Sequence, residues 1–569
     1  MARISSAALL AGALCYSACG ARPDTADGAS DLIVYGRVWT GDSAKPWAQA
    51  VAVSGDTIAA VGDSATIAKT QGSDTRIIAN GKAMVVPGFM DGHAHFLRGG
   101  FQLTSVDLRD AASPAEFIAR IKAFAAKSKP GEWILGGTWD HENWPGTPLP
   151  DRSWIDSVTP NNPVFVDLLD GHMALANSLA LEKAGVNRNT REIPGGRIVR
   201  RPNGEPTGVL KDEAQGPVSA VIPVPSESQS DAALTRAMEW AASKGVTAVA
   251  DVDVPWYEVA ALRRAHAAGK LTTRVSVYVP LRYWRAMADT VRVQGAGDDR
   301  LRVAGVKGYV DGSLGSTTAL FYQPYNDAPK TFGLFVTPED SLRAWIGAAD
   351  SAGLQVAVHA IGERANGVLL DIFDSVGKAH GSRDRRFRIE HAQHLRPRDI
   401  ARLATSGAVA SMQPYHAIDD GRWAQKRIGP ERIKTTYAFR SLLERGGRLA
   451  FGSDWTVAPL DPILGIYAAV TRRTLDDKNP EGWVPGEKIT VEQALRAYTA
   501  TNAYGVFAES SRGKLAAGYL ADLVLLDRNL ISIPPGTINQ AGVRATIIGG
   551  KVVFQKDGQR SLASERGSD

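Results

Sequence analysis

Short apolar runs at both ends of the chain are separated by Gly and Asp residues. At the start they fall within residues 31–86, and a similar pattern returns within residues 510–556. Runs of this length between turn residues are typical of strands in a small β-sandwich or an open barrel. The pattern therefore predicts one small β-sandwich domain built from both terminal regions, with the rest of the chain inserted between them.

Residues 87–509 show a different pattern, in which short apolar runs alternate with helical stretches such as 230–244 and 337–352. This alternation predicts a parallel sheet made of strand–helix units. The fold class predicted is therefore α/β, with a (β/α)8 TIM-like barrel as its main domain. Eight runs are candidate strands, the number that closes such a barrel: 84–90, 245–251, 273–279, 303–310, 354–359, 386–390, 407–412 and 448–453.

A large insert is predicted after the first barrel strand, at about 97–230, because the gap to the second strand is far longer than the others. It begins at the carboxyl end of a strand, the face that carries the active site in barrels. We therefore expect the insert to form a lid or a pocket wall. Its Trp residues favour a substrate with an apolar or aromatic substituent: Trp133, Trp139, Trp144 and Trp154.

Composition narrows the classes of function. The 569 residues are 44% hydrophobic and 22% charged, an ordinary globular composition with ample core. The 65 Lys and Arg residues exceed the 60 Asp and Glu residues by only five, and no dense basic run is present. We therefore expect no nucleic-acid partner.

Residues 1–19 are predicted to be a signal peptide. Arg3 gives a positive start, and residues 7–14 are apolar but too short to span a bilayer. The segment is similar to a bacterial lipoprotein signal, which would anchor the protein to the membrane through a lipid on Cys19. Plain secretion into the periplasm is the alternative. Because the other cysteine is Cys15, no Cys beyond this segment can act as nucleophile or ligand.

Six residues with metal-ligand side chains lie at or near the ends of candidate strands: His93, His95, Lys307, His359, His391 and Asp454. The carboxyl ends of barrel strands meet at one face, so we expect these side chains to converge. Four imidazoles, an amine and a carboxylate suit a hydrolytic centre with one or two divalent ions. For a single His taken alone, a buried hydrogen-bonded role is the alternative.

Lys307 and Asp454 have the most specific chemistry in this set. A buried Lys needs a partner or altered chemistry, and a carbamate formed with carbon dioxide would be an anion able to bridge two cations. An ion pair with Asp311 is the alternative, which spacing alone does not separate. Asp454 could bind a metal and also take a proton from an attacking water, or it could instead cap the next helix.

These segments resemble the amidohydrolase superfamily, and more closely its family-3, YtcJ-like branch, which includes N-substituted formamide deformylases. The resemblance covers nearly everything from Asp31 to Phe554. One departure is Thr456, which stands where many relatives have Pro and concerns the substrate more than the chemistry. The residues that carry the resemblance are Pro87-Gly88-Phe89-Met90-Asp91-Gly92-His93-Ala94-His95, Asp311-Gly312-Ser313-Leu314-Gly315-Ser316, His359-Ala360-Ile361-Gly362-Glu363-Arg364-Ala365, Arg388-Ile389-Glu390-His391-Ala392-Gln393 and Gly452-Ser453-Asp454-Trp455.

The resemblance implies a role for each of these side chains. His93 and His95 would hold the first metal, His359 and His391 the second, and carboxylated Lys307 would bridge them. Asp454 would be a ligand and the general base. Zinc is the ion expected for imidazole and oxygen ligands, and a single-metal site with unmodified Lys307 is the alternative.

Two further histidines are candidates near the substrate. His172 matches a family segment and would polarise or position the scissile carbonyl, and His416 follows the seventh strand. A structural hydrogen-bonding role is the alternative for each. His141 is a weaker candidate, and His266 and His380 are expected at the surface.

The function predicted is hydrolysis of a carbon–nitrogen bond other than a peptide bond, in a small-molecule substrate such as an amide. An esterase, lactonase or deaminase on the same scaffold is the alternative enzyme, because metal-activated water does not itself choose the bond. A binding protein that keeps the fold without activity is a third hypothesis. Self-association into a homo-oligomer stays open.

Overall fold

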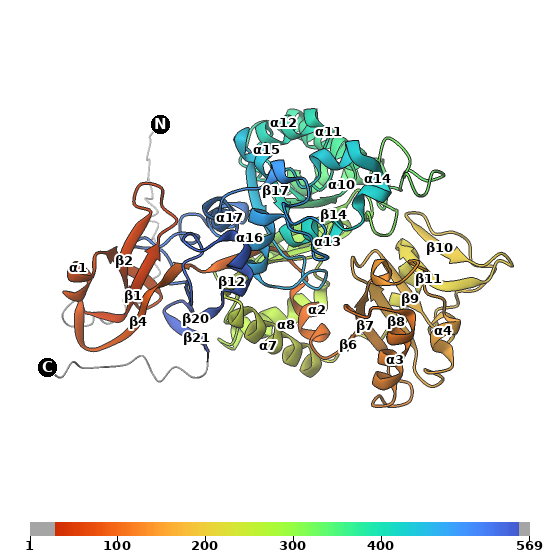
Figure 1. Cartoon of the computed structure of the whole chain (residues 1–569), viewed down its shortest axis with the longest axis horizontal. Helices are drawn as coiled ribbons and strands as arrows, with labels where there is room; N and C mark the ends of the chain where they lie inside the picture. The colour runs from red at the N-terminus through yellow and green to blue at the C-terminus, as the bar shows by residue number, and fades with distance from the viewer. Residues whose placement is uncertain (1–28, 557–569) are drawn as a thin grey trace, which may run out of the picture.

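A computed structural model describes residues 29–556, which form three β-sheets. An eight-stranded sheet lies in the middle of the molecule, with a seven-stranded sheet on one side and a six-stranded sheet on the other (Figure 1). The predicted signal at 1–19 lies outside the described residues, so export and lipidation stay predictions. Within 29–556, no helix combines the length and apolarity needed to cross a bilayer.

The eight-stranded sheet is a parallel barrel whose strands follow chain order. Its first and last strands meet where Asp454 N donates to His93 O (2.7 Å) and His95 N donates to Trp455 O (2.6 Å). The predicted α/β fold with a TIM-like barrel is therefore confirmed. The strands are β5 (Phe89–Ala94), β12 (Val246–Val252), β13 (Arg274–Pro280), β14 (Leu301–Tyr309), β15 (Gln355–Ala360), β16 (Arg388–His391), β17 (Val409–Met412) and β18 (Arg448–Phe451).

Helices surround the barrel and connect its strands. The helical stretches expected at 230–244 and 337–352 are α7, which begins with a capping box between Ser226 and Gln229, and α10. The helices of this region are α2 (Phe96–Gln102), α7 (Glu227–Ser243), α8 (Trp256–Ala267), α9 (Trp284–Gln294), α10 (Glu339–Ser351), α11 (Glu363–His380), α12 (Pro397–Thr405), α13 (Pro414–Asp420), α14 (Ala424–Arg432), α15 (Phe439–Glu444), α16 (Pro462–Thr471), α17 (Val491–Ala497) and α18 (Ala500–Gly505), with the short turns η3 (Leu281–Tyr283), η4 (Ile433–Thr435) and η5 (Pro485–Glu487).

The first barrel strand differs from the prediction at 84–90. Residues 84–87 belong to the terminal sheet, as the end of β4 (Gln71–Pro87), and the barrel strand starts at Phe89. The chain changes sheets at Gly88, where a Cβ atom would lie 2.3 Å from the hydroxyl of Thr247. Only glycine fits that approach. His93 therefore lies within β5, and His95 just after it.

The seven-stranded sheet joins both terminal regions. Strand β19 pairs with β4, so the last strands extend the sheet begun by the first. One hydrophobic cluster combines Val51 and Val53 of β2 with Ala545 and Ile547 of β20, so the sheet folds over a shared core as a sandwich does. Its elements are β1 (Ser30–Trp39), β2 (Trp47–Ser54), β3 (Thr57–Gly62), β4, β19 (Leu523–Leu526), β20 (Val543–Ile548) and β21 (Lys551–Gln555), with α1 (Ser64–Ala68) and η6 (Pro535–Gln540).

The insert forms the six-stranded sheet, drawn in orange and yellow in Figure 1. It lies between α2 and α7, as expected for a segment inserted after the first barrel strand. Its elements are β6 (Val106–Asp107), β7 (Ile134–Trp139), β8 (Val164–Leu168), β9 (Met173–Ala176), β10 (Gly196–Arg200), β11 (Pro206–Asp212), α3 (Pro114–Ala125), α4 (Ser153–Asp156), α5 (Ser178–Lys183), α6 (Gly216–Ser219), η1 (His141–Asn143) and η2 (Glu213–Gln215).

Three of the four Trp residues named in the insert do not support the reason given for an aromatic substituent; Trp133 is the exception, because it lines a cavity. Trp139 and Trp144 are buried and stack on each other at 5.9 Å between ring centroids, and Trp154 packs beside Trp144. These three rings fill the core of the insert. A core needs large apolar side chains as much as a pocket does, so their abundance in the sequence gives no information about the substrate.

Candidate metal centre

The predicted ligands converge at the carboxyl ends of the barrel strands. Asp454 Oδ1 lies 3.4 Å from Nε2 of His93 and 3.3 Å from Nε2 of His95. Ligand atoms of His93, His391 and Asp454 all lie within 4.8 Å of one another. Each comes from a different strand end, and the parallel order of the sheet brings these ends to one face.

A second pair of rings continues this group. His359 lies 4.5 Å from His391 and 4.8 Å from His172, measured between ring centroids. His359 Nε2 donates to the Gly312 carbonyl (3.1 Å), which leaves the lone pair on Nδ1 free to bind a metal. The structure thus brings all the predicted histidine ligands and Asp454 to one site.

Buried partners fix the orientation of two ligand rings. Nδ1 of His93 donates to Glu390 (2.6 Å), and Nδ1 of His391 donates to the amide oxygen of Gln413 (2.8 Å). Both bonds leave Nε2 free as a metal ligand, an arrangement typical of metal-binding histidines. Arg388 in turn binds Glu390 (2.7 Å) inside the barrel, and this partner outweighs the effect of burial, so the pKa of Glu390 lies below its ordinary value.

Asp91 links the first and last strand ends. Its carboxylate accepts hydrogen bonds from His93 N (3.0 Å) and from Ser453 N (3.0 and 3.1 Å). Burial raises the pKa of Asp91 to about 7. His391 and Asp454 themselves adopt positive φ angles of 72° and 57°, which non-glycine residues keep only where the surroundings hold them. The two residues are therefore held in position by the rest of the site.

The protonation states suit a cation. Burial lowers the pKa of His93, His359 and His391, so these rings are neutral. Burial acts to raise the pKa of Asp454, but the neighbouring His93, His95 and His391 lower it well below its ordinary value. Neutral imidazoles and an ionised carboxylate are the forms that bind metal, so the donor set fits a divalent ion.

Lys307 is buried beside this group, with 2% of its surface exposed. Among residues 29–556 it forms no ion pair, and its Nζ lies 4.5 Å from the centre of the Tyr309 ring. Asp311, the alternative partner, instead accepts hydrogen bonds from the backbone of Leu320, Ile361 and Gly362. Burial lowers the pKa of Lys307, which favours the neutral amine that carboxylation requires. The carbamate stays a prediction.

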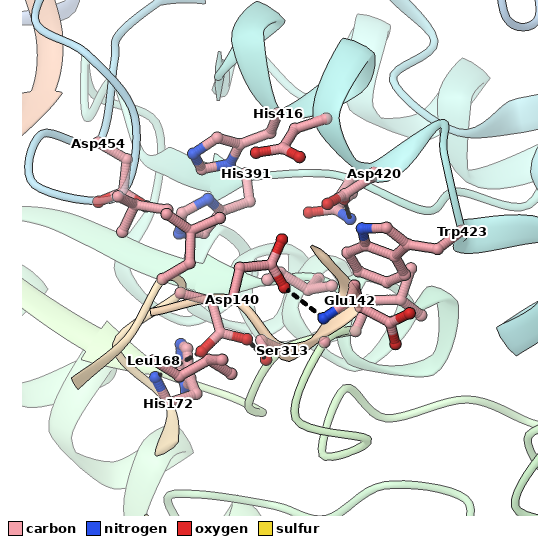
Figure 2. A pocket seen from close by; sticks show the side chains of 18 of the residues that line it. Asp140, Glu142, Leu168, His172, Ser313, His391, His416, Asp420, Trp423 and Asp454 are labelled. Atoms are coloured by element: carbon pink, nitrogen blue, oxygen red, sulfur yellow. Dashed lines mark hydrogen bonds between the residues drawn. The ribbon is translucent and has the colours of Figure 1, made fainter. Parts of the chain in front are cut away.

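Two adjoining cavities border the centre. The central cavity, of about 230 Å³, is lined by His93, His95, Lys307 and His172, among others. The small pocket, of about 70 Å³, is shown in Figure 2, where His391, His416 and Asp454 lie together and Trp423 and Asp420 lie farther along the wall. The acidic side chains of the small pocket include Asp140, Glu142, Asp170, Asp419 and Asp420.

The second-rank histidines differ in their surroundings. Nδ1 of His172 donates to Asp212 (2.7 Å), which leaves Nε2 free. His416 is half-buried, and its Nε2 atom is buried without a partner among the described residues. His141, the weaker candidate, also lines the small pocket. His266 and His380 are partly exposed and pair with acidic residues away from the site, as expected.

Several residues of the site were not singled out from the sequence. Glu390 and Gln413 lie near proposed site residues in the sequence. The rings that they contact, those of His93 and His391, belong to other strands. Asp212 binds His172 over a separation of 40 residues. One signal in the sequence could have identified Glu390. It lies two residues after Arg388 on the same strand, and residues two apart on a strand point to the same side of the sheet.

Comparison with known proteins gives a match over most of the chain. A family model described as "Amidohydrolase family" matches residues 77–554. The protein LONG AFTER FAR-RED 3 of Arabidopsis thaliana is 40% identical over 92% of this chain and 91% of its own. The putative amidohydrolase YtcJ of Bacillus subtilis is 31% identical, over 89% and 96%. The N-substituted formamide deformylase of Arthrobacter pascens is 29% identical, over 93% and 98%.

A solved structure gives the same result. An uncharacterized metal-dependent hydrolase from Pyrococcus horikoshii OT3 is similar with a TM-score of 0.72 and 30% identity, covering 89% of this chain and 99% of its own. The similarity extends over the barrel and both additional sheets, because so little of either chain is left out. The resemblance inferred from the motifs is confirmed.

Proposed function

Because the chain belongs to the amidohydrolase family of metal-dependent hydrolases, we propose that it hydrolyses a carbon–nitrogen bond in a small, non-peptide amide. The observation that carries the proposal is the position of Asp454, whose Oδ1 lies within 3.4 Å of the imidazoles of both His93 and His95. A carboxylate at this position can bind an ion and can also accept a proton from a water molecule. The deformylase named above supports the choice of an amide.

In this proposal the ions are held by the side chains described above. His93, His95 and Asp454 would hold one ion, His359 and His391 would hold a second, and Lys307, if carboxylated, would be a ligand to both. Zinc is the expected element because the donors are imidazole nitrogens and oxygens. When bound, such an ion supplies Lewis acidity, which lowers the pKa of an attacking water and polarises a carbonyl group.

The residues of the chain then move the proton. Asp454 takes a proton from the attacking water as the general base and passes it to the leaving nitrogen. Its carboxylate is available at neutral pH because the surrounding imidazoles keep its pKa low.

His172 would position the substrate carbonyl through Nε2. Its Nδ1 is held by Asp212, so the orientation of the ring is fixed before substrate arrives. Burial acts to lower the pKa of His172, but Asp212 outweighs it and the pKa is raised. The raised pKa favours the protonated ring, in which Nε2 also carries a hydrogen and can donate it to the carbonyl oxygen.

The test uses full-length protein loaded with zinc in the presence of bicarbonate. N-alkylformamides, N-acyl amines and cyclic amides are offered beside matched esters and lactones, and release of amine or alcohol is measured. We expect amide turnover that a chelator abolishes and added zinc restores. A metal content under about half an equivalent with no loss on chelation would exclude a metal-dependent enzyme. Turnover of esters alone would overturn the choice of bond.

A further inference from the structure

A large cavity lies between the insert and the barrel helices α2, α7 and α8. Its volume is about 700 Å³, within the range of small-molecule sites. We call it the insert cavity. Apolar side chains from both sides line it: Phe101, Trp133, Leu135, Phe165, Ile222 and Val224.

The insert cavity adjoins the central cavity beside the metal centre. Six residues line both: Arg98, Thr138, Asp167, Gly171, Gln215 and Thr456. At Gly171, a Cβ atom would meet nothing within 4 Å, so this part of the shared lining borders open space. A molecule that reaches the ligand residues can therefore extend into the insert cavity.

An ion pair forms part of this shared lining. Arg98 of α2 binds Asp167 of β8 at 2.5 Å, and so joins the barrel to the insert. Since the two charges neutralise each other, the shared lining selects neither an anion nor a cation. Beyond it the lining is largely apolar, which favours a neutral hydrocarbon group.

Size points to the same conclusion. The small pocket holds about 70 Å³ and the central cavity about 230 Å³, so neither has space for a long substituent in addition to the reacting amide. The insert cavity is several times larger. A bulky group attached to the amide would have to extend into it.

We propose that the insert cavity holds an apolar substituent of the substrate, so that the natural substrates are amides with an alkyl or aryl group of several carbons. This inference rests on the proposed amide hydrolysis. The specificity comes from Trp133, Leu135 and Phe165 of the insert and Phe101 of α2, none of which touches the metal ligands. It does not depend on Trp139 and Trp144, which lie in the core of the insert.

The test measures binding and turnover separately. Full-length, zinc-loaded protein is titrated by calorimetry with methyl alkyl ketones from butyl to octyl. In these ketones CH2 replaces the NH of an N-alkylacetamide, so hydrolysis is impossible. N-alkylformamides of the same lengths are assayed for turnover. We expect the Kd of the ketones to fall about threefold for each added methylene, because each CH2 leaves water, and kcat/KM of the formamides to rise in parallel.

Two variants and a matched control locate the effect. Ser219→Trp fills the insert cavity from an exposed position on α6, and Val224→Glu places a charge on its rim, where Val224 is 69% exposed. Val293→Glu is the control, since Val293 is equally exposed but lies on α9, away from these cavities. We expect Ser219→Trp to weaken octyl binding about tenfold and Val224→Glu about threefold, with butyl binding and the control unchanged.

The outcomes separate this inference from the proposed function. Binding that does not depend on chain length, or that is equal in Ser219→Trp and Val293→Glu, would overturn the inference even if amides are hydrolysed. Chain-length-dependent binding that Ser219→Trp removes would support it, even if none of the formamides is hydrolysed. In that second case the proposed amide hydrolysis would be wrong, and the inference about the insert cavity would stand.

Discussion

The barrel and the insert both border the metal centre, but they hold their side chains by different means. Barrel residues lie on strand ends that are fixed by neighbouring strands and by buried partners such as Glu390 and Asp91. The insert contributes His172, whose ring is oriented by one side-chain hydrogen bond, to Asp212. We therefore expect the barrel to determine whether metal binds, and the insert to determine how the substrate is positioned. Three variants test this division, from the largest expected effect to the smallest, and a fourth tests a buried carboxyl group of the barrel region.

Asp454→Asn should remove the base that the barrel supplies. We expect kcat to fall at least about a thousandfold, because general-base catalysis contributes factors of this order. The melting temperature should stay close to that of the wild type, since the substitution keeps the size of the side chain. Activity assays with calorimetric melting curves measure both. Retained turnover would remove Asp454 as the base.

Glu390→Gln should affect metal binding more than chemistry. Loss of the partner of His93 is expected to weaken zinc binding about 10- to 100-fold. Arg388 would also lose its buried counter-charge, which costs about 3 kcal/mol of unfolding free energy. Chelator competition measures the first effect and denaturant unfolding the second. Unchanged zinc affinity would contradict the role given to Glu390.

Asp212→Asn should affect substrate and leave metal in place. Without the carboxylate the pKa of His172 falls, and we expect kcat/KM to decrease about tenfold, the size of a lost hydrogen bond to a charged group. Zinc content, measured in the same sample, should match that of the wild type. If zinc is lost as well, the proposed division between barrel and insert is wrong.

Asp420→Asn should change the pH dependence of stability. Burial raises the pKa of Asp420 to about 8, and its Oδ2 accepts bonds from Gln393 (2.7 Å) and Tyr437 (2.6 Å). The folded state therefore holds a proton that the unfolded state releases near pH 4. As a result, stability is lost as the pH rises from about 4 to 8.

The Asn variant has a neutral side chain of the same shape at this position. We expect its melting temperature to fall less than that of the wild type between pH 5 and 8, with a difference of a few degrees. Thermal unfolding at both pH values measures it. Identical pH profiles would mean that Asp420 is ionised in the folded protein.

The sequence allowed prediction of the barrel and the ligand set because parallel strands bring their carboxyl ends together. His359 and His391 could thus be assigned to one site from their positions alone. The start of the first strand could not be predicted, since residues 84–87 are apolar in either sheet. Their assignment depends on Gly88 and its close approach to Thr247.

Contacts between distant segments were the other limit. The pairing of His172 with Asp212 depends on how the insert sheet is ordered, which no local pattern encodes. Trp139, Trp144 and Trp154 were misjudged for a related reason. Composition does not say which face of a sheet a ring occupies, so core rings such as Trp139 and pocket-lining rings such as Trp133 look the same in the sequence.

The link through Asp91 has a consequence for the order of assembly. Asp91 joins the amide of His93 to that of Ser453, which lies 362 residues after Asp91 in the chain. Contacts between such distant residues form late in folding. A growing chain that has passed the first two histidines therefore lacks the carboxylate that completes their site. We expect stable metallation only after synthesis has reached the last barrel strand, so that bound zinc reports a finished fold.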